Sequence, residues 1–344
     1  MRRIFNNILF VVGCVAVVVM VLAFDVNISQ LWSYLTQASW WLLAIFVLWI
    51  VVYCMNTLAW STIISGSGPR NISLWHLLQL TVSGYALNSA TSIGLVSGEP
   101  YRVVELSRYI GTQRATSSVV LFVMTHTYSH FWFWLTAVVA YLLSWSVGWV
   151  EMTTPIAWGL GFATLLSCGG IWLFLAGYKH GMVVWLLRGV GHIPGLKRWS
   201  RKMLAEHGEG LQHIDELIAQ LRGQRRSSFL KSLGLEYSAR LLQCLEVFAI
   251  LVIFHADAGF SPITLLHAFF ILAFTSLFAN MLGFIPMQIG GREGGFAMSV
   301  AGLGMSASTG LGISIICRVR ELLFDVIGMI WMKLSDWIWK QQKE

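Results

Sequence analysis

Long apolar stretches dominate this chain, and short polar stretches separate them. Six apolar segments are each long enough to cross a bilayer core of about 30 Å at about 1.5 Å per residue in a helix. They cover residues 8–24, 40–64, 116–147, 155–178, 228–254 and 310–334. The pattern predicts a polytopic membrane protein built from helices.

Two further apolar segments end differently from these six. Residues 74–96 and 263–289 run directly into glycine-rich, charged stretches, the second of which reads GFIPMQIGGREGGF at 283–296. Broken backbone and charge are unfavourable in hydrocarbon unless they face protein or a water-filled cavity. We therefore expect these two stretches to lie against an internal polar cavity.

The charges in the loops predict the orientation of the chain. The connections 25–39, 148–154 and 255–262 contain no Lys or Arg, whereas residues 179–231 hold ten Lys or Arg against four Asp or Glu. By the positive-inside rule, both termini and the basic segment are expected on the cytoplasmic side of the plasma (inner) membrane. Within it, residues 179–227 are expected to form amphipathic helices on the anionic leaflet.

This orientation constrains the two glycine-rich segments. With six crossing segments and both termini inside, residues 74–114 and 263–306 must each return to the side from which they enter. They are predicted to be re-entrant helical hairpins from opposite faces, which is the pattern of an inverted repeat with halves near 40–147 and 228–334. The predicted fold class is an all-α polytopic membrane protein, with about six transmembrane helices and two oppositely oriented re-entrant hairpins, in a single integral membrane domain over residues 1–344.

The composition narrows the function classes. The chain is 56% hydrophobic and 11% charged, against about 25% charged in soluble domains, so a separate soluble domain is not expected. Membrane topology accounts for the net charge of +7, which argues against nucleic-acid binding. The five cysteines are scattered singly, without metal-ligand spacing, and no nucleotide-binding or hydrolase motif is present. We expect no cofactor, no metal and no enzymatic activity.

The second glycine-rich stretch offers an anion site. Gly290 and Gly291 permit a tight turn and the close approach of a headgroup. Arg292 can make a bidentate contact to a phosphate or carboxylate, and Glu293 can neutralise Arg292 between cargo events or carry a proton. The alternative is a static Arg292–Glu293 pair that staples the loop.

The first glycine-rich stretch offers Gly98, Glu99 and Arg102 as further substrate-binding candidates. Glu99, Arg102, Glu105 and Arg108 are spaced by three residues, so neighbours of opposite sign can pair along a helix. Part of this row is expected to be solvated. A plain surface ion pair is the alternative for Glu99 and Arg102.

Polar residues also occur deep in the spans that follow the hairpins. In the last span, Arg318, Glu321 and Asp325 share a helix face and need partners, either one another or a cavity. Arg318 and Arg320 are both candidates for substrate binding.

His126 and His130 stand at i, i+4 in the span after the first hairpin. They are interpreted as hydrogen-bonded core histidines or as a proton relay, together with Glu99 or Glu293. Glu236 and Arg240, also at i, i+4, are interpreted as a structural pair.

The glycine-rich stretch 283–296 resembles a motif of a known family. Pro286, Gly290 and Glu293 match a Pro-Gly-Gly-x-Gly-x-x-Glu-like pattern, although Met287 and Gln288 replace its glycine pair. In this loop the chain resembles the flippase-like transmembrane family that includes the membrane region of lysylphosphatidylglycerol synthase. Earlier, Gly98, Glu99 and Arg102 reproduce a Gly-Glu-x-x-Arg element of that family, without the proline often found upstream.

The resemblance implies movement of an anionic, aminoacylated or polyprenyl-phosphate-linked lipid between leaflets. The bifunctional synthases also carry a soluble aminoacyltransferase domain after the membrane part, and this chain stops at Glu344, so that activity is expected to be missing. The alternatives are an integral-membrane enzyme acting on lipid headgroups and a non-transporting assembly partner of another membrane protein.

Overall fold

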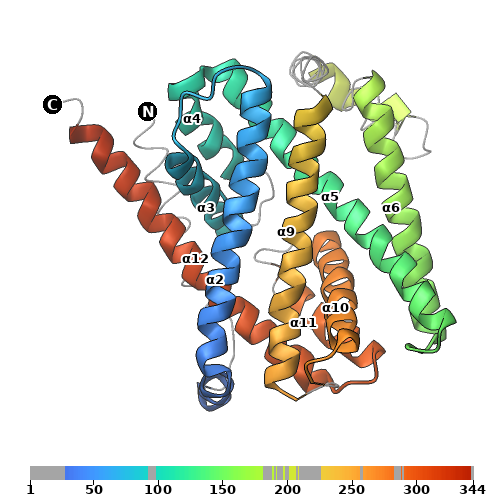
Figure 1. The fold of residues 1–344 in the computed structure, drawn as a ribbon. Helices are drawn as coiled ribbons and strands as arrows, with labels where there is room; N and C mark the ends of the chain where they lie inside the picture. Colours follow the sequence, from blue (N-terminus) through green and yellow to red (C-terminus); the bar gives the residue numbers. More distant parts are fainter. Residues whose placement is uncertain are drawn as a thin grey trace.

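Figure 1 shows the protein as a computed structural model. The structure describes residues 28–91, 98–180, 188–189, 191, 197, 201–206, 208, 226–255, 259–282, 288 and 290–341. Within these ranges all regular secondary structure is helical. The predicted all-α class is therefore confirmed for the described part of the chain.

The helices fall into two similar runs. The first is α2 (Ile28–Gly66), α3 (Leu74–Thr91), α4 (Gly98–Ile110) and α5 (Thr112–Ser146), and the second is α9 (Arg226–Ile253), α10 (Pro262–Met281), α11 (Gly291–Gly302) and α12 (Ala307–Gln341). Between them lies α6 (Thr154–His180). Each run has a long helix, one of 18 or 20 residues, one of 13 or 12 residues, and a 35-residue helix.

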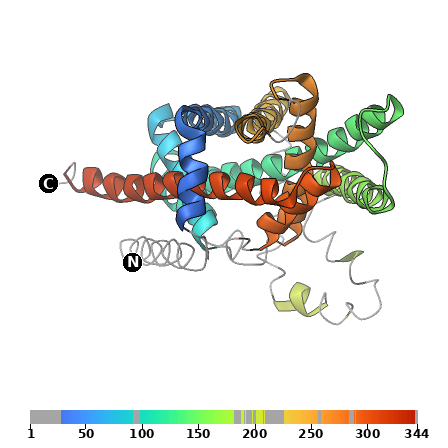
Figure 2. The same ribbon diagram turned by 90° about the horizontal axis from the view of Figure 1, so that it is seen from below.

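The two runs are oriented oppositely in Figure 1. Helices α2 and α9 pack side by side and run in opposite directions. The α3–α4 pair begins at the upper end of the molecule, and the α10–α11 pair begins at the lower end. Viewed from below, α12 lies across the width of the molecule (Figure 2), where it packs along α3.

Local sequence explains where several helices begin. Ser73 caps α3 by accepting a hydrogen bond from the His76 N–H at 3.2 Å, and Ser261 caps α10 by accepting one from the Thr264 N–H at 3.1 Å. Each short helix leads into its 35-residue helix through a glycine with positive φ, Gly111 at 79° and Gly304 at 78°. Residues with a Cβ rarely adopt this conformation, so both reversals depend on glycine.

Apolar packing holds each run together. In the first run, Trp60, Leu87 and Phe122 belong to one buried cluster, and in the second Ile271 and Phe296 belong to another. Between helices surrounded by lipid, such contacts contribute mainly through van der Waals packing, because lipid tails are as apolar as these side chains. Polar side chains are concentrated between the two clusters, where the candidate site lies.

Three described helices are long and apolar enough to cross a membrane: Trp40–Gly66, Thr154–Ala176 and Pro262–Met281. The predicted spans 116–147, 228–254 and 310–334 fall on α5, α9 and α12. These helices have sufficient length but are more polar, because they carry many of the side chains described below. The predicted span 8–24 lies outside the described residues.

Most of the predicted amphipathic segment 179–227 also lies outside the described residues. A short part of it, residues 201–206, is helical, and there Lys202 Nζ lies 3.7 Å from Glu206 Oε1. The predicted position of this segment on the leaflet surface stays a prediction.

Candidate functional site

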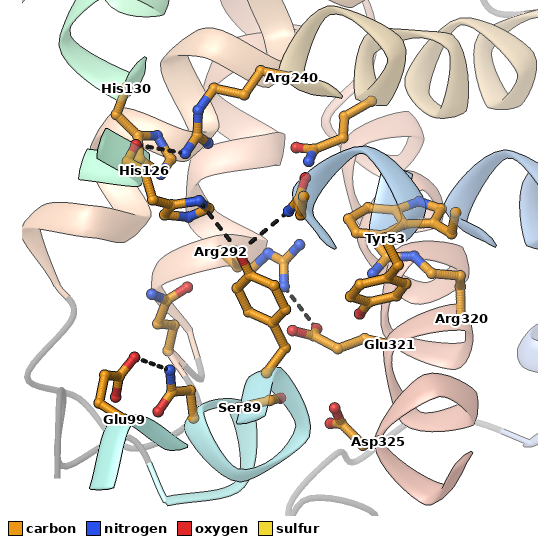
Figure 3. A pocket seen from close by; sticks show the side chains of 16 residues that line it. Tyr53, Ser89, Glu99, His126, His130, Arg240, Arg292, Arg320, Glu321 and Asp325 are labelled. Carbon is orange, nitrogen blue, oxygen red and sulfur yellow. Dashed lines mark hydrogen bonds and ion pairs between the residues drawn. The ribbon is translucent and has the colours of Figure 1, made fainter. Parts of the chain in front are cut away.

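A polar cavity of about 410 Å³ lies between the two helical runs (Figure 3). Its walls come from α2, α3, α4, α5, α9, α11 and α12, together with residue 288. The described lining residues are Trp49, Tyr53, Asn56, Tyr85, Asn88, Ser89, Glu99, His126, His130, Arg240, Gln243, Gln288, Arg292, Arg320, Glu321 and Asp325. Helices remote in sequence therefore converge on one polar volume.

The charges in this lining balance and are separated in space. Three arginines and three acids line the described walls, so their formal sum is zero if the histidines are neutral. Figure 3 shows Arg240 at one end, Glu99 and Asp325 at the other, and Arg292 with Glu321 between them. A cavity of this kind suits a ligand that carries charge of both signs.

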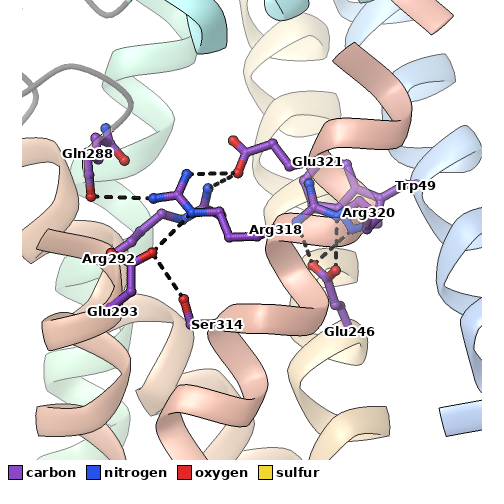
Figure 4. Close-up of polar contacts among 9 residues, drawn as sticks. All are labelled: Trp49, Glu246, Gln288, Arg292, Glu293, Ser314, Arg318, Arg320 and Glu321. Atoms are coloured by element: carbon purple, nitrogen blue, oxygen red, sulfur yellow. Dashed lines mark hydrogen bonds and ion pairs between the residues drawn. The ribbon is translucent and has the colours of Figure 1, made fainter. Parts of the chain in front are cut away.

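Arg292 and Glu293 are neighbours in sequence, but each forms its ion pair with α12 (Figure 4). Arg292 Nη1 donates to Glu321 Oε2 at 2.6 Å, and Arg318 Nε donates to Glu293 Oε1 at 3.1 Å. Arg318 Nη1 also reaches Glu321 Oε2 at 3.2 Å, which links all four charges. The described contacts do not include the alternative Arg292–Glu293 pair, because packing of α11 on α12 gives both residues other partners.

Glu293 also organises the start of α11. Its Oε2 accepts a hydrogen bond from the Gly290 N–H at 2.7 Å, and Gly290 has a φ of 80°. Gly291 is buried, and a Cβ there would lie 3.0 Å from Leu282. Gly290, Gly291, Glu293 and Arg318 thus support Arg292 without belonging to the described cavity lining.

Of the two candidate substrate contacts in α12, Arg320 lines the cavity, whereas Arg318 does not. The Arg320 guanidinium donates to both oxygens of Glu246, at 3.0 Å each, and its Cζ lies 3.6 Å from the centroid of the Trp49 ring. Trp49 Nε1 donates to Glu246 Oε2 at 2.9 Å. Bidentate pairing and ring stacking hold Arg320 in place, and its exposed fraction is 6%.

In the α3–α4 pair, Glu99 lines the cavity and Arg102 does not. The Arg102 side chain is 1% exposed, donates to the Thr81 carbonyl at 3.0 Å, and lies 3.6 Å from Glu99 Oε1. Its Cζ also lies over three rings, at 4.5 Å from Tyr85, 5.5 Å from Phe122 and 5.8 Å from Trp60.

The Arg102 contacts bear on two expectations. Glu105 is 3% exposed and pairs with Arg108 at 2.9 Å, so the part of the row that was expected to be solvated does not include Arg102 or Glu105. The sequence also predicts that Arg102 lines the site beside Glu99, but the aromatic rings of α2, α3 and α5 surround it instead. Cation–π contacts compensate for its burial.

Gly98 allows α3 and α4 to pack closely and does not line the cavity. A Cβ at this position would overlap the Gly84 carbonyl and the Asn88 side chain. Asn88 bridges the two helices, since its Oδ1 accepts from the Gly98 N–H at 3.0 Å and its Nδ2 donates to Glu99 Oε1 at 2.7 Å. This bridge fixes Glu99 at the cavity.

His126 and His130 both line the cavity from α5. His126 Nδ1 lies 2.7 Å from Glu236 Oε2 and 3.3 Å from the Tyr85 hydroxyl. Arg240 bonds to the same helix, with Nε 2.6 Å from Ser129 Oγ and Nη2 3.0 Å from the His126 carbonyl. Glu236 and Arg240, expected to pair with each other, thus both hydrogen-bond to α5.

The sequence analysis did not identify several of the residues that line the cavity. Trp49, Tyr53 and Asn56 stand four and three residues apart on one face of α2. Polar or amphipathic side chains at this spacing in an otherwise apolar span are a signal that could have identified them. Among the described residues there is no group of three or more His, Cys, Asp or Glu that could hold a metal ion.

A comparison with known protein families identifies the family to which this chain belongs. Residues 8–328 match the family described as the lysylphosphatidylglycerol synthase TM region. The chain belongs to this family. Neither the curated proteins nor the solved structures gave a match. The resemblance seen in the two short motifs is therefore confirmed over most of the chain.

Membership of the lysylphosphatidylglycerol synthase TM region family makes this an integral membrane protein with a role connected to membrane lipids. The match includes the first helical run, the second run as far as Gly328 in α12, and every described residue that lines the cavity.

Proposed function

We propose that this protein moves a lipid between membrane leaflets, with the headgroup passing through the polar cavity. The observation that carries the proposal is the convergence of seven helices, from both runs, on a charged volume of about 410 Å³ in a membrane protein. Charged groups inside a membrane are strongly unfavourable without a function or a partner. A headgroup pathway gives these groups a function, and the cost of burying them argues against the alternative of a non-transporting assembly partner.

The arrangement of the two runs supports alternating access. We take α3–α4 and α10–α11 to be re-entrant hairpins that enter from opposite faces, because their helix lengths correspond and they begin at opposite ends in Figure 1. Inverted repeats of this kind place a binding site near the midplane, where one repeat rocks against the other. The loop charges then place both termini on the cytoplasmic side of the inner membrane.

Arg292 is the proposed contact for the anionic part of the headgroup. Its side chain is 21% exposed toward the cavity, compared with 5% for Arg318. It lies in the first turn of α11, where unpaired N–H groups and the positive helix end also favour an anion. Glu321 holds the guanidinium at the cavity through a single Nη1 contact.

The cargo is proposed to be an anionic, aminoacylated or polyprenyl-phosphate-linked lipid. A fluorescent phospholipid assay in proteoliposomes tests transport directly, because externally added dithionite quenches only the label in the outer leaflet. Wild-type protein should raise the quenched fraction above that of empty liposomes. Arg292→Ala should slow this about tenfold or more, since a charge-assisted hydrogen bond is worth about 1.5–3 kcal/mol.

Arg108→Ala is the matched control, because Arg108 is also in a short hairpin helix and pairs with an acid but does not line the cavity. Equal loss in both variants, or no transport by folded wild-type protein, would contradict the proposal.

A second candidate is an enzyme that acts on lipid headgroups. The pair of His126 and Glu236, 2.7 Å apart at the cavity wall, favours it because such a pair can act as general acid and base. Incubation with lipids followed by mass spectrometry separates the two functions. A flippase leaves all lipid masses unchanged, whereas an enzyme produces a new mass that His126→Gln abolishes.

A further inference from the structure

Asp325 is a buried acid whose described contacts leave it without a basic partner. It lines the cavity from α12 and is 3% exposed. One carboxylate oxygen, Oδ2, has no hydrogen-bond partner among the described residues, and the Ser89 hydroxyl of α3 lies close enough to stabilise the carboxylate. A buried carboxylate in this situation is strongly unfavourable unless a cation or a proton neutralises it.

The charged groups around Asp325 do not supply that cation. Glu321 stands one helical turn earlier and repels it more strongly than either Arg320 or Arg318 attracts it. Arg292 and Arg318 bond to Glu321 and Glu293, and Arg320 bonds to both oxygens of Glu246. Arg240 lies at the far end of the cavity in Figure 3. The positive charge on these four arginines is therefore directed to other acceptors.

The surroundings of Asp325 are rich in acceptors. Ser89 lies near the end of α3, whose last residue is Thr91. The last turn of α3 contains no basic residue. The C-terminal end of a helix carries partial negative charge from the aligned peptide dipoles, which favours a cation. Glu99, at the same end of the cavity, also has an oxygen, Oε2, without a hydrogen-bond partner in the described part of the chain.

We propose that Asp325, Ser89 and Glu99 form a subsite for one positively charged group, at the end of the cavity away from Arg240. The occupant is either the primary ammonium of a lipid headgroup or a free monovalent cation such as Na⁺. A single fully buried carboxylate with a hydroxyl and helix-end acceptors suits one positive charge. The described residues contain no cluster of three acids, histidines or cysteines for a multivalent metal.

Two binding measurements on the purified full chain in detergent test the subsite. The first records thermal unfolding in NaCl, KCl or N-methyl-D-glucamine chloride at equal ionic strength. The second uses native mass spectrometry with equal amounts of short-chain phosphatidylethanolamine and phosphatidylglycerol. Wild-type protein should show saturable stabilisation by Na⁺ or K⁺, or about tenfold preference for the amine lipid, a ratio that corresponds to about 1.4 kcal/mol.

Asp325→Asn keeps the shape of the side chain and should abolish whichever effect is seen. Glu105→Gln is the matched control, because Glu105 is equally buried but lies outside the cavity lining, and it should retain the effect. If Asp325→Asn does not fold, Ser89→Ala provides the second variant and should weaken binding about threefold or more, as expected for loss of one hydrogen bond to a charged group.

The two arms identify the occupant. Salt-dependent stabilisation identifies a free cation, and amine-lipid preference identifies a headgroup ammonium. The proposal is overturned if wild-type protein shows neither effect, or if folded Asp325→Asn or Ser89→Ala retains it in full. Because both measurements record binding, Asp325-dependent binding without lipid flipping would remove the transport proposal and leave the cation subsite intact.

Discussion

Arg292 Nη1 and Glu321 Oε2 lie 2.6 Å apart and join the start of α11 to the middle of α12. The same glutamate oxygen accepts from Arg318, and Arg318 in turn binds Glu293. The α11 turn is thus anchored at two adjacent residues by two residues of α12. This arrangement presents Arg292 to the cavity while keeping its charge compensated.

The shared role of Glu321 predicts unequal effects of neutralising the pair. Glu321→Gln removes the negative charge that two arginines share, so it should destabilise the protein more than Arg292→Gln does. A double-mutant cycle over Arg292 and Glu321 should give a coupling free energy of about 0.5–3 kcal/mol in denaturant-induced unfolding in detergent. The exposed pair of Lys202 and Glu206 is the control, with a coupling close to zero. Equal coupling in the two cycles would contradict the described network.

Arg320 and Glu246 are predicted to contribute mainly to stability. Glu246→Gln leaves the 6% exposed guanidinium of Arg320 without its bidentate partner, which should cost about 3–5 kcal/mol of unfolding free energy. The loss should be visible as a lower unfolding midpoint. Replacing both residues by apolar side chains should recover much of it, because no buried charge is then left unpaired. Failure of the double replacement to recover any stability would show that the pair is needed for more than charge compensation.

Arg102 should behave differently from Arg292 although both were candidate substrate contacts. Arg102→Ala removes contacts with three aromatic rings and the Thr81 carbonyl, so it should lower the unfolding midpoint. In folded Arg102→Ala protein, the set of co-purifying lipids should match wild type, because Arg102 does not line the cavity. Arg292→Ala should instead lose an enriched anionic lipid class. Mass spectrometry of extracted lipids compares the two, and loss of the same lipid class in both variants would place Arg102 at the headgroup.

Gly98 is predicted to be intolerant of a side chain. Gly98→Ala places a methyl group against the Gly84 carbonyl and the Asn88 side chain, which should separate α3 from α4 and displace Glu99. We expect a loss of about 1–3 kcal/mol, as for other overpacked sites, together with weaker lipid enrichment. Gly234→Ala is the matched control, because nothing lies within 4 Å of the position that its methyl group would take and alanine favours the helix. A neutral Gly98→Ala would contradict the tight contact.

Much of the fold followed from the sequence alone. Apolar length is a local property, so it located the long helices. The breaks after 74–96 and 263–289 marked where α3 and α10 give way to short helices. Glu99, Arg292, His126 and His130 were identified because charged or polar side chains within apolar stretches are energetically costly and therefore mark a partner or a functional site. All four line the cavity.

The tertiary structure alone decided which charges meet. Adjacency in the loop offered an Arg292–Glu293 pair as an alternative, and i, i+4 spacing suggested that Glu236 would pair with Arg240. Packing of α11 on α12 and of α5 on α9 brought other partners within reach. Packing likewise surrounded Arg102 with aromatic rings and left Asp325 facing the cavity. The physical reason is that periodicity determines which side chains share a helix face, whereas the partner of that face depends on contacts between helices far apart in the chain.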